Sequence, residues 1–216
     1  MNPLAEFGPF FALDLAPGSG RPMTELADDP KVLAGRIDRV TEALVARAPT
    51  QVSVPVRVAA SVMHLGLVAR IIAPMVGLGV LTDSSPAAPL LPGWTLEQLR
   101  WQDHLGGPFP LGLADAVPGR PAVETITRAV ADRWPVAERV LWGNVGSAAN
   151  SAAMMIVRDR PELTGPALRI AGQVLADPRI DDGMTKAGSG FRRRSCCLIY
   201  QVSGDRTACC GDCVLL

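Results

Sequence analysis

Hydrophobic residues recur at intervals of three and four positions along much of the chain, the spacing that gathers them on one face of an α-helix. The pattern is regular over residues 31–48, where Asp28-Asp29-Pro30 supplies a helix start and Pro49 an end. A second, more uniformly apolar helix is expected over residues 54–72, and Pro74 is expected to break it. Further helices are expected over residues 121–134, 135–159 and 161–177.

Shorter segments of the chain have the character of strands. Residues 96–102 and 109–114 flank the stretch 104–107, which ends in two glycines, and this arrangement predicts an antiparallel hairpin with a glycine turn. Residues 9–15 are mostly apolar and end at a Pro-Gly-Ser-Gly turn, so we expect a strand there as well. The whole pattern predicts an α+β fold that is predominantly helical, with a helical core and a small antiparallel β element.

Composition narrows the class of protein. Of the 216 residues, 48% are hydrophobic and 19% are charged, so the chain can bury a sizeable core. The formal net charge is zero. This balance argues against a nucleic-acid-binding protein, because such proteins normally carry a basic surplus.

Two apolar stretches, residues 52–81 and 140–157, raise the question of a membrane span. Arginine and histidine interrupt the first and asparagine and serine the second, so buried helices of a soluble protein explain both, and no transmembrane segment is expected. The first six residues have no basic segment and no long apolar segment, so no signal peptide is expected. We therefore expect a cytoplasmic protein, with peripheral contact at the inner membrane at most.

All five cysteines lie within residues 196–213, and this clustering is the main chemical signal in the chain. Cys196 and Cys197 are adjacent, and Cys210 and Cys213 form a Cys-x-x-Cys pair. Four thiolates from two short segments suit a soft metal centre, either zinc or an iron–sulfur cluster. A disulfide framework is disfavoured, because a cytosolic cysteine cluster more often binds metal or is catalytic.

The adjacent pair bears on which metal is bound. Structural zinc sites usually take each half of their ligands from a Cys-x(2–4)-Cys turn that brings both sulfurs to one ion. Neighbouring residues project their side chains in different directions, so they reach two different irons more easily than one tetrahedral zinc. On spacing alone, an iron–sulfur cluster ranks ahead of zinc, and a redox-active dithiol ranks third.

The helix expected over residues 135–159 has a face of small side chains that would let another segment approach closely, so we expect it to be the central packed helix. Asn144 in this helix could donate a hydrogen bond to a cluster sulfur, although a buried asparagine more often bonds to backbone. His64, on the apolar helix, is more often a satisfied core histidine than a catalytic one. The small residues of the face are Gly143, Gly146, Ser147, Ala149, Asn150 and Ala153.

The sequence has no other convincing catalytic constellation. It contains no Ser-His-Asp arrangement, no His-Glu-x-x-His motif, no P-loop and no Gly-x-Gly-x-x-Gly dinucleotide motif. Electrons for a redox centre would therefore have to come from another protein or a small reductant.

Residues 191–200, followed by Cys210-Gly211-Asp212-Cys213, resemble the carboxy-terminal motif of the FhuF-type ferric-siderophore reductases. That motif is Cys-Cys-x10-Cys-x2-Cys and holds a [2Fe–2S] cluster. Carried onto this chain, the ligands are Cys196, Cys197, Cys210 and Cys213. Twelve residues separate Cys197 from Cys210 here instead of ten. Cys209 is treated as the spare cysteine, although the spacing leaves the choice between Cys209 and Cys210 open.

The resemblance implies a function and partners. The protein would reduce a ferric siderophore by one electron and release Fe(II) in the cytoplasm, with a ferredoxin, a flavoprotein or a small reductant as external donor. Arg192, Arg193 and Arg194 would favour the reduced cluster and attract an anionic chelate or an acidic donor. Asn144 would lie near the cluster. Residues 1–190 would form the scaffold and docking domain, and residues 191–216 the cluster-binding segment packed on it.

Two other readings remain open from the sequence. The tail could bind zinc as a structural clip on a helical interaction module. It could also hold an iron–sulfur cluster that serves an electron carrier or a sensor with no siderophore site.

Overall fold

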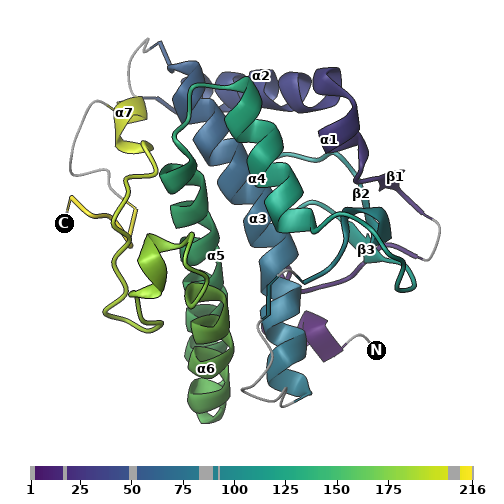
Figure 1. Cartoon of the computed structure of the whole chain (residues 1–216), viewed down its shortest axis with the longest axis vertical. Helices are drawn as coiled ribbons and strands as arrows, with labels where there is room; N and C mark the ends of the chain where they lie inside the picture. The colour runs from purple at the N-terminus through teal and green to yellow at the C-terminus, as the bar shows by residue number, and fades with distance from the viewer. Residues whose placement is uncertain are drawn as a thin grey trace.

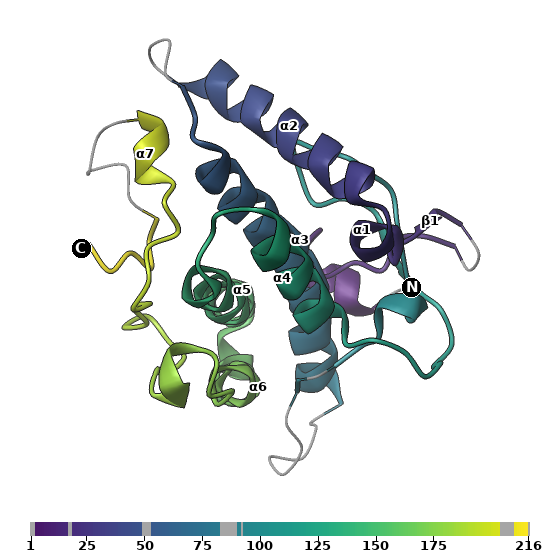
Figure 2. The same cartoon turned by 45° about the horizontal axis from the view of Figure 1, so that its top comes forward.

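The computed structural model describes residues 3–16, 19–48, 53–82, 90–91, 93–203 and 210–215. Long helices form the body of the molecule, and a small sheet and a C-terminal tail lie at its sides (Figures 1 and 2). The long helices are α2 (Pro30–Arg47), α3 (Val56–Leu81), α4 (Ala122–Arg133), α5 (Glu138–Asp159) and α6 (Thr164–Leu175). The shorter helical elements are η1 (Pro3–Phe7), α1 (Glu25–Asp28), η2 (Leu96–Gln98), η3 (Pro161–Leu163), η4 (Asp181–Gly183) and α7 (Tyr200–Ser203).

The helices predicted from the apolar spacing are confirmed. At the start of α2 the Asp29 side chain accepts a hydrogen bond from the amide of Lys31 at 2.9 Å, and Pro30 is the first helical residue. A side-chain acceptor and a proline without an N–H both suit the first turn of a helix, whose amides have no partner within the helix. The helix expected over 161–177 begins with the 3-10 turn η3 and continues as α6.

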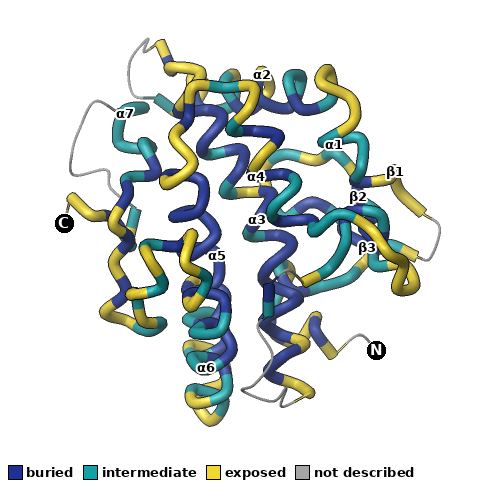
Figure 3. Tube along the Cα trace, viewed as in Figure 1, coloured by how far each residue is buried: buried dark blue, intermediate teal, exposed yellow. Residues whose placement is uncertain are grey.

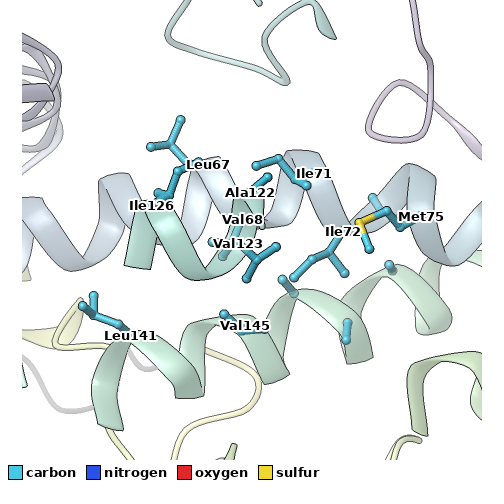
Figure 4. Packing of buried hydrophobic residues seen from close by; sticks show 14 of the residues in the cluster. Leu67, Val68, Ile71, Ile72, Met75, Ala122, Val123, Ile126, Leu141 and Val145 are labelled. Carbon is cyan, nitrogen blue, oxygen red and sulfur yellow. The ribbon is translucent and has the colours of Figure 1, made fainter. Parts of the chain in front are cut away.

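Helices α3 and α5 form the centre of the fold, and they pack against each other more extensively than any other pair of elements. Figure 4 shows Ile72 of α3 on the side of that helix toward α5, which carries Leu141 and Val145, and α4 with Val123 in front of α3. These side chains are almost completely buried. Burying a side chain of this size contributes about 1.5–3 kcal/mol, so this contact supplies much of the stability.

The prediction that Pro74 breaks the apolar helix is wrong, because α3 continues through it to Leu81. A proline inside a helix costs about 3 kcal/mol, through a lost hydrogen bond and a steric clash. The turns after Pro74 bury Met75, Val76 and Val80 in the core. Burial of three such side chains exceeds the cost of the proline, so the helix is kept.

The predicted hairpin is confirmed and carries one further strand. Strands β2 (Leu99–Trp101) and β3 (Leu111–Leu113) are antiparallel, with Leu99 opposite Leu113 and Trp101 opposite Leu111. Strand β1 (Arg21–Pro22) pairs with the other edge of β2, which gives the order β1-β2-β3. The fold is therefore α+β and predominantly helical, as the pattern predicts.

The strand predicted over residues 9–15 is not formed. The carbonyls of Phe10 and Ala12 instead accept hydrogen bonds from the buried guanidinium of Arg70, which also donates to the carbonyl of Phe109. Asp14 accepts from Arg70 as well, and its own amide donates to Leu111. Arg70 thus takes the role of donor to these carbonyls of the segment, and the amides of Asp14 and Leu15 both donate to the single carbonyl of Leu111, so no strand ladder forms.

Helices α3 and α5 are long and apolar enough to cross a membrane by length and composition alone. Within the fold, 72% of the apolar window of α3 and 78% of that of α5 are buried. Figure 3 shows both helices as mostly buried between the sheet side and the tail side of the molecule. Their hydrophobicity is accounted for by the core that they form.

The C-terminal tail, defined here as residues 191–203 and 210–215, lies along α5 on the side of the α3–α5 pair away from the sheet (Figures 1 and 2). Gly143 and Gly146 on α5 make this approach close. A side chain at Gly143 would meet Ser195 and Arg193, and one at Gly146 would meet Ile180 and neighbouring side chains. The small residues of α5 therefore accept the tail and the segment leading into it, as the sequence predicts of this face.

Candidate metal centre

Four cysteines of the tail lie within the described residues, and Cys209 lies outside them. The sulfurs of Cys197 and Cys210 are 3.4 Å apart, although twelve residues separate the two in sequence. The backbone joins the same two segments, since the amide of Arg193 donates to the carbonyl of Asp212 at 3.2 Å. The folded tail thus brings the adjacent pair and the Cys-x-x-Cys pair together.

Two backbone amides point at sulfur. The amide of Leu198 donates to the Cys196 sulfur at 3.3 Å, and that of Leu215 donates to the Cys213 sulfur at 3.4 Å. Leu198 has a φ of 71°, which a leucine rarely adopts. Such amides stabilise thiolate sulfurs, and hydrogen bonds of this kind help set the properties of metal–thiolate centres.

The four sulfurs differ in exposure. Cys197 and Cys213 are buried, whereas Cys196 and Cys210 are half-buried. One side of the cysteine cluster is therefore covered by the protein, and the other side is within reach of the surface.

The pKa values of Cys196, Cys197 and Cys210 depend on the neighbouring thiols. The hydrogen bond with Cys210 lowers the pKa of Cys197 to about 6, and the same contact raises the pKa of Cys210 well above its ordinary value. Burial raises the pKa of Cys196, and the charges of Cys197 and Cys213 raise it further. The Cys197–Cys210 pair thus releases its first proton easily and its second with difficulty. A metal binds thiolates, so Cys197 is the sulfur best prepared to bind one.

Arg193 lies beneath the cysteines and is buried, with 1% of its surface exposed. Its guanidinium donates to the Asn144 side-chain oxygen at 2.8 Å, to the Val140 carbonyl at 2.9 Å and to the Ser195 hydroxyl at 3.3 Å. The sequence places it in an arginine triplet expected to attract a substrate or a donor. Burial corrects that expectation for Arg193, because its guanidinium does not reach the surface.

The other two arginines of the triplet are exposed. Arg192 donates to the neighbouring carbonyl of Phe191 at 2.9 Å. Arg194 lies 3.6 Å from the carboxylate of Asp182, and its amide donates to Asp181. Alternate residues of this extended stretch thus face the protein and the solvent.

None of the four described cysteines accepts a hydrogen bond from Asn144 through its sulfur. The Asn144 amide nitrogen donates to the Ser61 carbonyl at 3.0 Å, while its oxygen accepts from Arg193. Ser61 in turn donates to the carbonyl of Cys197 at 3.0 Å. Asn144 is therefore linked to the tail in two ways. It contacts Arg193 directly, and it reaches the carbonyl of Cys197 through Ser61.

His64 is a satisfied core histidine, as expected for its place on an apolar helix. Its Nε2 lies 3.0 Å from the Thr127 hydroxyl, whose own hydrogen is donated to the Val123 carbonyl. The ring must therefore carry its hydrogen on Nε2, and Nδ1 accepts from Asn144 at 3.4 Å. Burial, and to a lesser extent the charge of Arg193, lower the pKa of His64 to about 3, so the ring is neutral.

Sequence reasoning missed Ser61 and Ser195, which hold the tail to the helices. The Ser195 hydroxyl donates to the Arg139 carbonyl at 2.9 Å and accepts from Arg193. Ser61 precedes His64 by three residues, so both lie on one side of α3. Two polar residues at this spacing on a very apolar helix are the signal that could have identified a buried polar contact there.

The arrangement of the sulfurs bears on the group they could hold. Within the part of the chain that the structure describes, no three His, Cys, Asp or Glu side chains gather closely enough for a single ion. Instead the one sulfur–sulfur contact among the described cysteines joins Cys197 to Cys210, one from each cysteine pair. A rhombic [2Fe–2S] cluster takes two thiolates at each iron. Two cysteine pairs that meet in this way, without three ligands close enough for one ion, fit it better than a single tetrahedral zinc.

A cavity of about 520 Å³ lies between α2, α3 and residues 104–109. It is on the α2 side of α3, away from the tail (Figures 1 and 2). It therefore does not belong to the cysteine site.

Residues 193–215 match the family model described as the FhuF 2Fe-2S C-terminal domain. Comparison with curated proteins and with solved structures gave no match to the chain. The matched segment covers the four described cysteines, Arg193 and Ser195, so it coincides with the part of the tail that packs on α3 and α5. Residues 193–215 are therefore similar to the FhuF 2Fe–2S C-terminal domain, and this similarity supports a [2Fe–2S] cluster as the cofactor.

Proposed function

We propose that this protein is a cytoplasmic ferric-siderophore reductase, which delivers one electron to chelated Fe(III) so that Fe(II) leaves the chelator. The observation that carries the proposal is the match of the tail to a FhuF 2Fe–2S domain. Fe(II) carries less charge than Fe(III) and is a softer ion, so hard oxygen ligands hold it more weakly. The reaction needs neither a nucleophile nor an acid–base pair, and the sequence contains no motif for either.

We assign the cluster ligands to Cys196, Cys197, Cys210 and Cys213, with Cys209 outside the ligand set. The 3.4 Å contact between the sulfurs of Cys197 and Cys210 supports Cys210 as the third ligand.

The cluster, when bound, supplies the capacity to take up one electron and pass it on. The chain's own groups hold and orient that centre. The amides of Leu198 and Leu215 donate to two ligand sulfurs, and Ser61 fixes the carbonyl of Cys197. The half-buried positions of Cys196 and Cys210 leave one side of the centre near the surface. There a ferric siderophore and an external donor, such as a ferredoxin, a flavoprotein or a small reductant, could approach in turn.

The exposed cations of the tail suit an anionic chelate. Arg192 borders a hollow of about 340 Å³ whose lining also includes Lys186 and Phe191. Both charged side chains belong to exposed residues, which lie four and ten positions before the first cysteine. They would raise the local concentration of a negatively charged ferric chelate, and less so at high ionic strength.

The test begins with the protein purified without oxygen. We expect a red-brown protein that gives a rhombic S = ½ EPR signal when reduced with dithionite. On mixing with a ferric siderophore, the reduced protein should be re-oxidised with one Fe(II) trapped per electron. A gallium siderophore, which cannot be reduced, should leave the protein reduced.

Cysteine variants test the ligand set in the same experiment. Cys210→Ser should lose the cluster spectrum, whereas the matched variant Cys209→Ser should keep it. A colourless protein with stoichiometric zinc, unable to take up a cluster, would reject the reductase in favour of a zinc-clipped helical module. A cluster that ferric siderophores do not re-oxidise would point instead to an electron carrier or a sensor.

A further inference from the structure

Arg193 differs from the two other buried arginines in what balances its charge. Arg36 pairs with Asp103, and Arg70 lies 3.3 Å from Asp14. Arg193 is as buried as Arg70, yet its hydrogen-bond partners are an amide, a carbonyl and a hydroxyl, all of which are neutral. Within the described part of the chain, no carboxylate forms an ion pair with it. Burying an ionised group is costly unless an opposite charge compensates it.

One donor of Arg193 also lacks an acceptor. Its Nε is buried and has no hydrogen-bond partner among the described residues. An N–H group in this situation normally finds an acceptor, and buried exceptions call for an explanation such as an ion or a group absent from the coordinates. The guanidinium thus shows both a missing negative charge and a missing hydrogen-bond acceptor.

The groups on which Arg193 acts are the cysteines. Its guanidinium donates to the hydroxyl of Ser195, which directly precedes Cys196, and its amide donates to the carbonyl of Asp212, which directly precedes Cys213. The cluster held by these sulfurs is anionic and becomes more so when it accepts an electron. It therefore provides the negative charge that the protein around Arg193 lacks.

The surrounding helices hold the guanidinium in place. Asn144 accepts from Arg193 and is itself oriented, because its amide donates to the Ser61 carbonyl and to Nδ1 of His64. Thr127 fixes the opposite side of the histidine ring. His64 is neutral, so Arg193 contributes the only net charge in this hydrogen-bonded set.

We propose that Arg193 is the internal counter-charge of the cluster: a buried, helix-held cation that stabilises the reduced state and so raises the reduction potential. The proposal rests on the proposed function only in that Cys196, Cys197, Cys210 and Cys213 hold the cluster. Arg193 is a positioning residue that acts through the cluster, and it touches neither the siderophore nor the donor. Its role differs from that of the exposed Arg192 and Arg194, whose charges are screened by solvent.

The test compares reduction potentials in reconstituted protein, by anaerobic redox titration followed by EPR. Arg193→Met removes the charge and keeps a long side chain, and Arg193→Lys keeps the charge. Arg192→Gln removes a neighbouring exposed charge and is the matched control. We expect Arg193→Met to raise the ratio of oxidised to reduced protein at a fixed potential by tenfold or more. For a one-electron couple this corresponds to a reduction potential lower by about 59 mV. Arg193→Lys and Arg192→Gln should each change it by less than threefold.

A second variant keeps the test decisive if Arg193→Met does not retain the cluster. Asn144→Asp leaves Arg193 in place but sets a carboxylate against its guanidinium, so the potential should fall in the same direction. The apoprotein gives a further readout, since cluster loading should raise the melting temperature of the wild type more than that of Asn144→Asp, whose arginine is already paired.

Unchanged potentials in Arg193→Met and Asn144→Asp, with a normal cluster spectrum, would overturn the assignment of Arg193 while leaving the proposed function intact. A wild-type protein that binds no cluster would instead reject the proposed function itself. The two failures are therefore distinguishable in the same set of samples.

Discussion

Replacing Gly143 by alanine is the sharpest test of how the tail is seated on α5. A methyl group at this position would lie 2.2 Å from the Ser195 hydroxyl and 2.8 Å from a guanidinium nitrogen of Arg193. Real contacts of this kind are about 3.4 Å or longer, so the hydroxyl must move back by about 1.2 Å, the difference between the two distances. The side chains of Ser195 and Arg193, both in the tail, cannot keep their present positions with alanine here.

Two opposing effects set the size of the change. Alanine favours the helix over glycine by about 1 kcal/mol. Overpacking costs about 1–3 kcal/mol. Moving these two side chains also strains the hydrogen bonds from Arg193 to the Val140 carbonyl and from Ser195 to the Arg139 carbonyl, each worth about 1 kcal/mol or more. The steric and hydrogen-bond costs win, so the free energy of unfolding should fall by about 2 kcal/mol.

The assay is urea unfolding of the apoprotein, followed by cluster reconstitution of the same samples. Gly172→Ala is the matched control, because Gly172 lies inside α6 and an added methyl group there meets nothing within 4 Å. The control should gain up to about 1 kcal/mol and load its cluster normally. Gly143→Ala should lose stability and reconstitute poorly, because Ser195 directly precedes Cys196.

One result would refute this reasoning. If Gly143→Ala were stabilised as much as Gly172→Ala and took up its cluster equally well, the tail would not pack on Gly143 as described.

Three further predictions concern Arg70, His64 and removal of the cluster. Arg70→Met should lower the free energy of unfolding by about 3–5 kcal/mol, because one buried and two partly buried carbonyls lose their donor. Arg128→Met at an exposed site should change it by under about 0.5 kcal/mol, and equal effects in denaturant titrations would contradict the role of Arg70. The pKa of His64 is about 3 in the folded protein and 6.5 ordinarily, so protonation below pH 6.5 favours the unfolded state. Stability should therefore fall by up to about 1.4 kcal/mol per pH unit as the pH drops from 6.5 toward 3, and His64→Gln should lessen this slope; an unaltered slope would show that His64 is not its source. Removing the cluster should leave the helical circular dichroism signal nearly unchanged, because the described α3–α5 contact involves no cysteine. Limited proteolysis should increase within the tail. Loss of the helical signal would contradict a core that is independent of the tail.

The sequence predicts the helices and the hairpin well, because each depends on spacing within one segment. It fails where a distant side chain intervenes. Pro74 remains inside α3 because the residues after it are buried by other elements. Residues 9–15 do not form a strand because Arg70, about sixty positions later, takes their carbonyls.

The candidate site likewise has one part that the sequence predicts and another that it does not. Cysteine spacing predicts the metal chemistry, since a metal centre constrains the residues nearest to it. An arginine triplet gives no sign of which member is buried, because that depends on the register of the tail against α5. The contact of Asn144 with Arg193 and the anchoring by Ser61 likewise appear only once the helices are packed.

The hydrogen bond between Ser61 and Cys197 spans 136 positions of the chain. A ribosome synthesises the helices that receive the tail well before it reaches the cysteines, and folding of the emerging chain generally proceeds from the amino terminus. The helical seat can therefore be complete while the ligands are still being made. Iron and sulfide would then be delivered to a tail that docks on helices already folded, so cluster insertion follows the folding of the helical body.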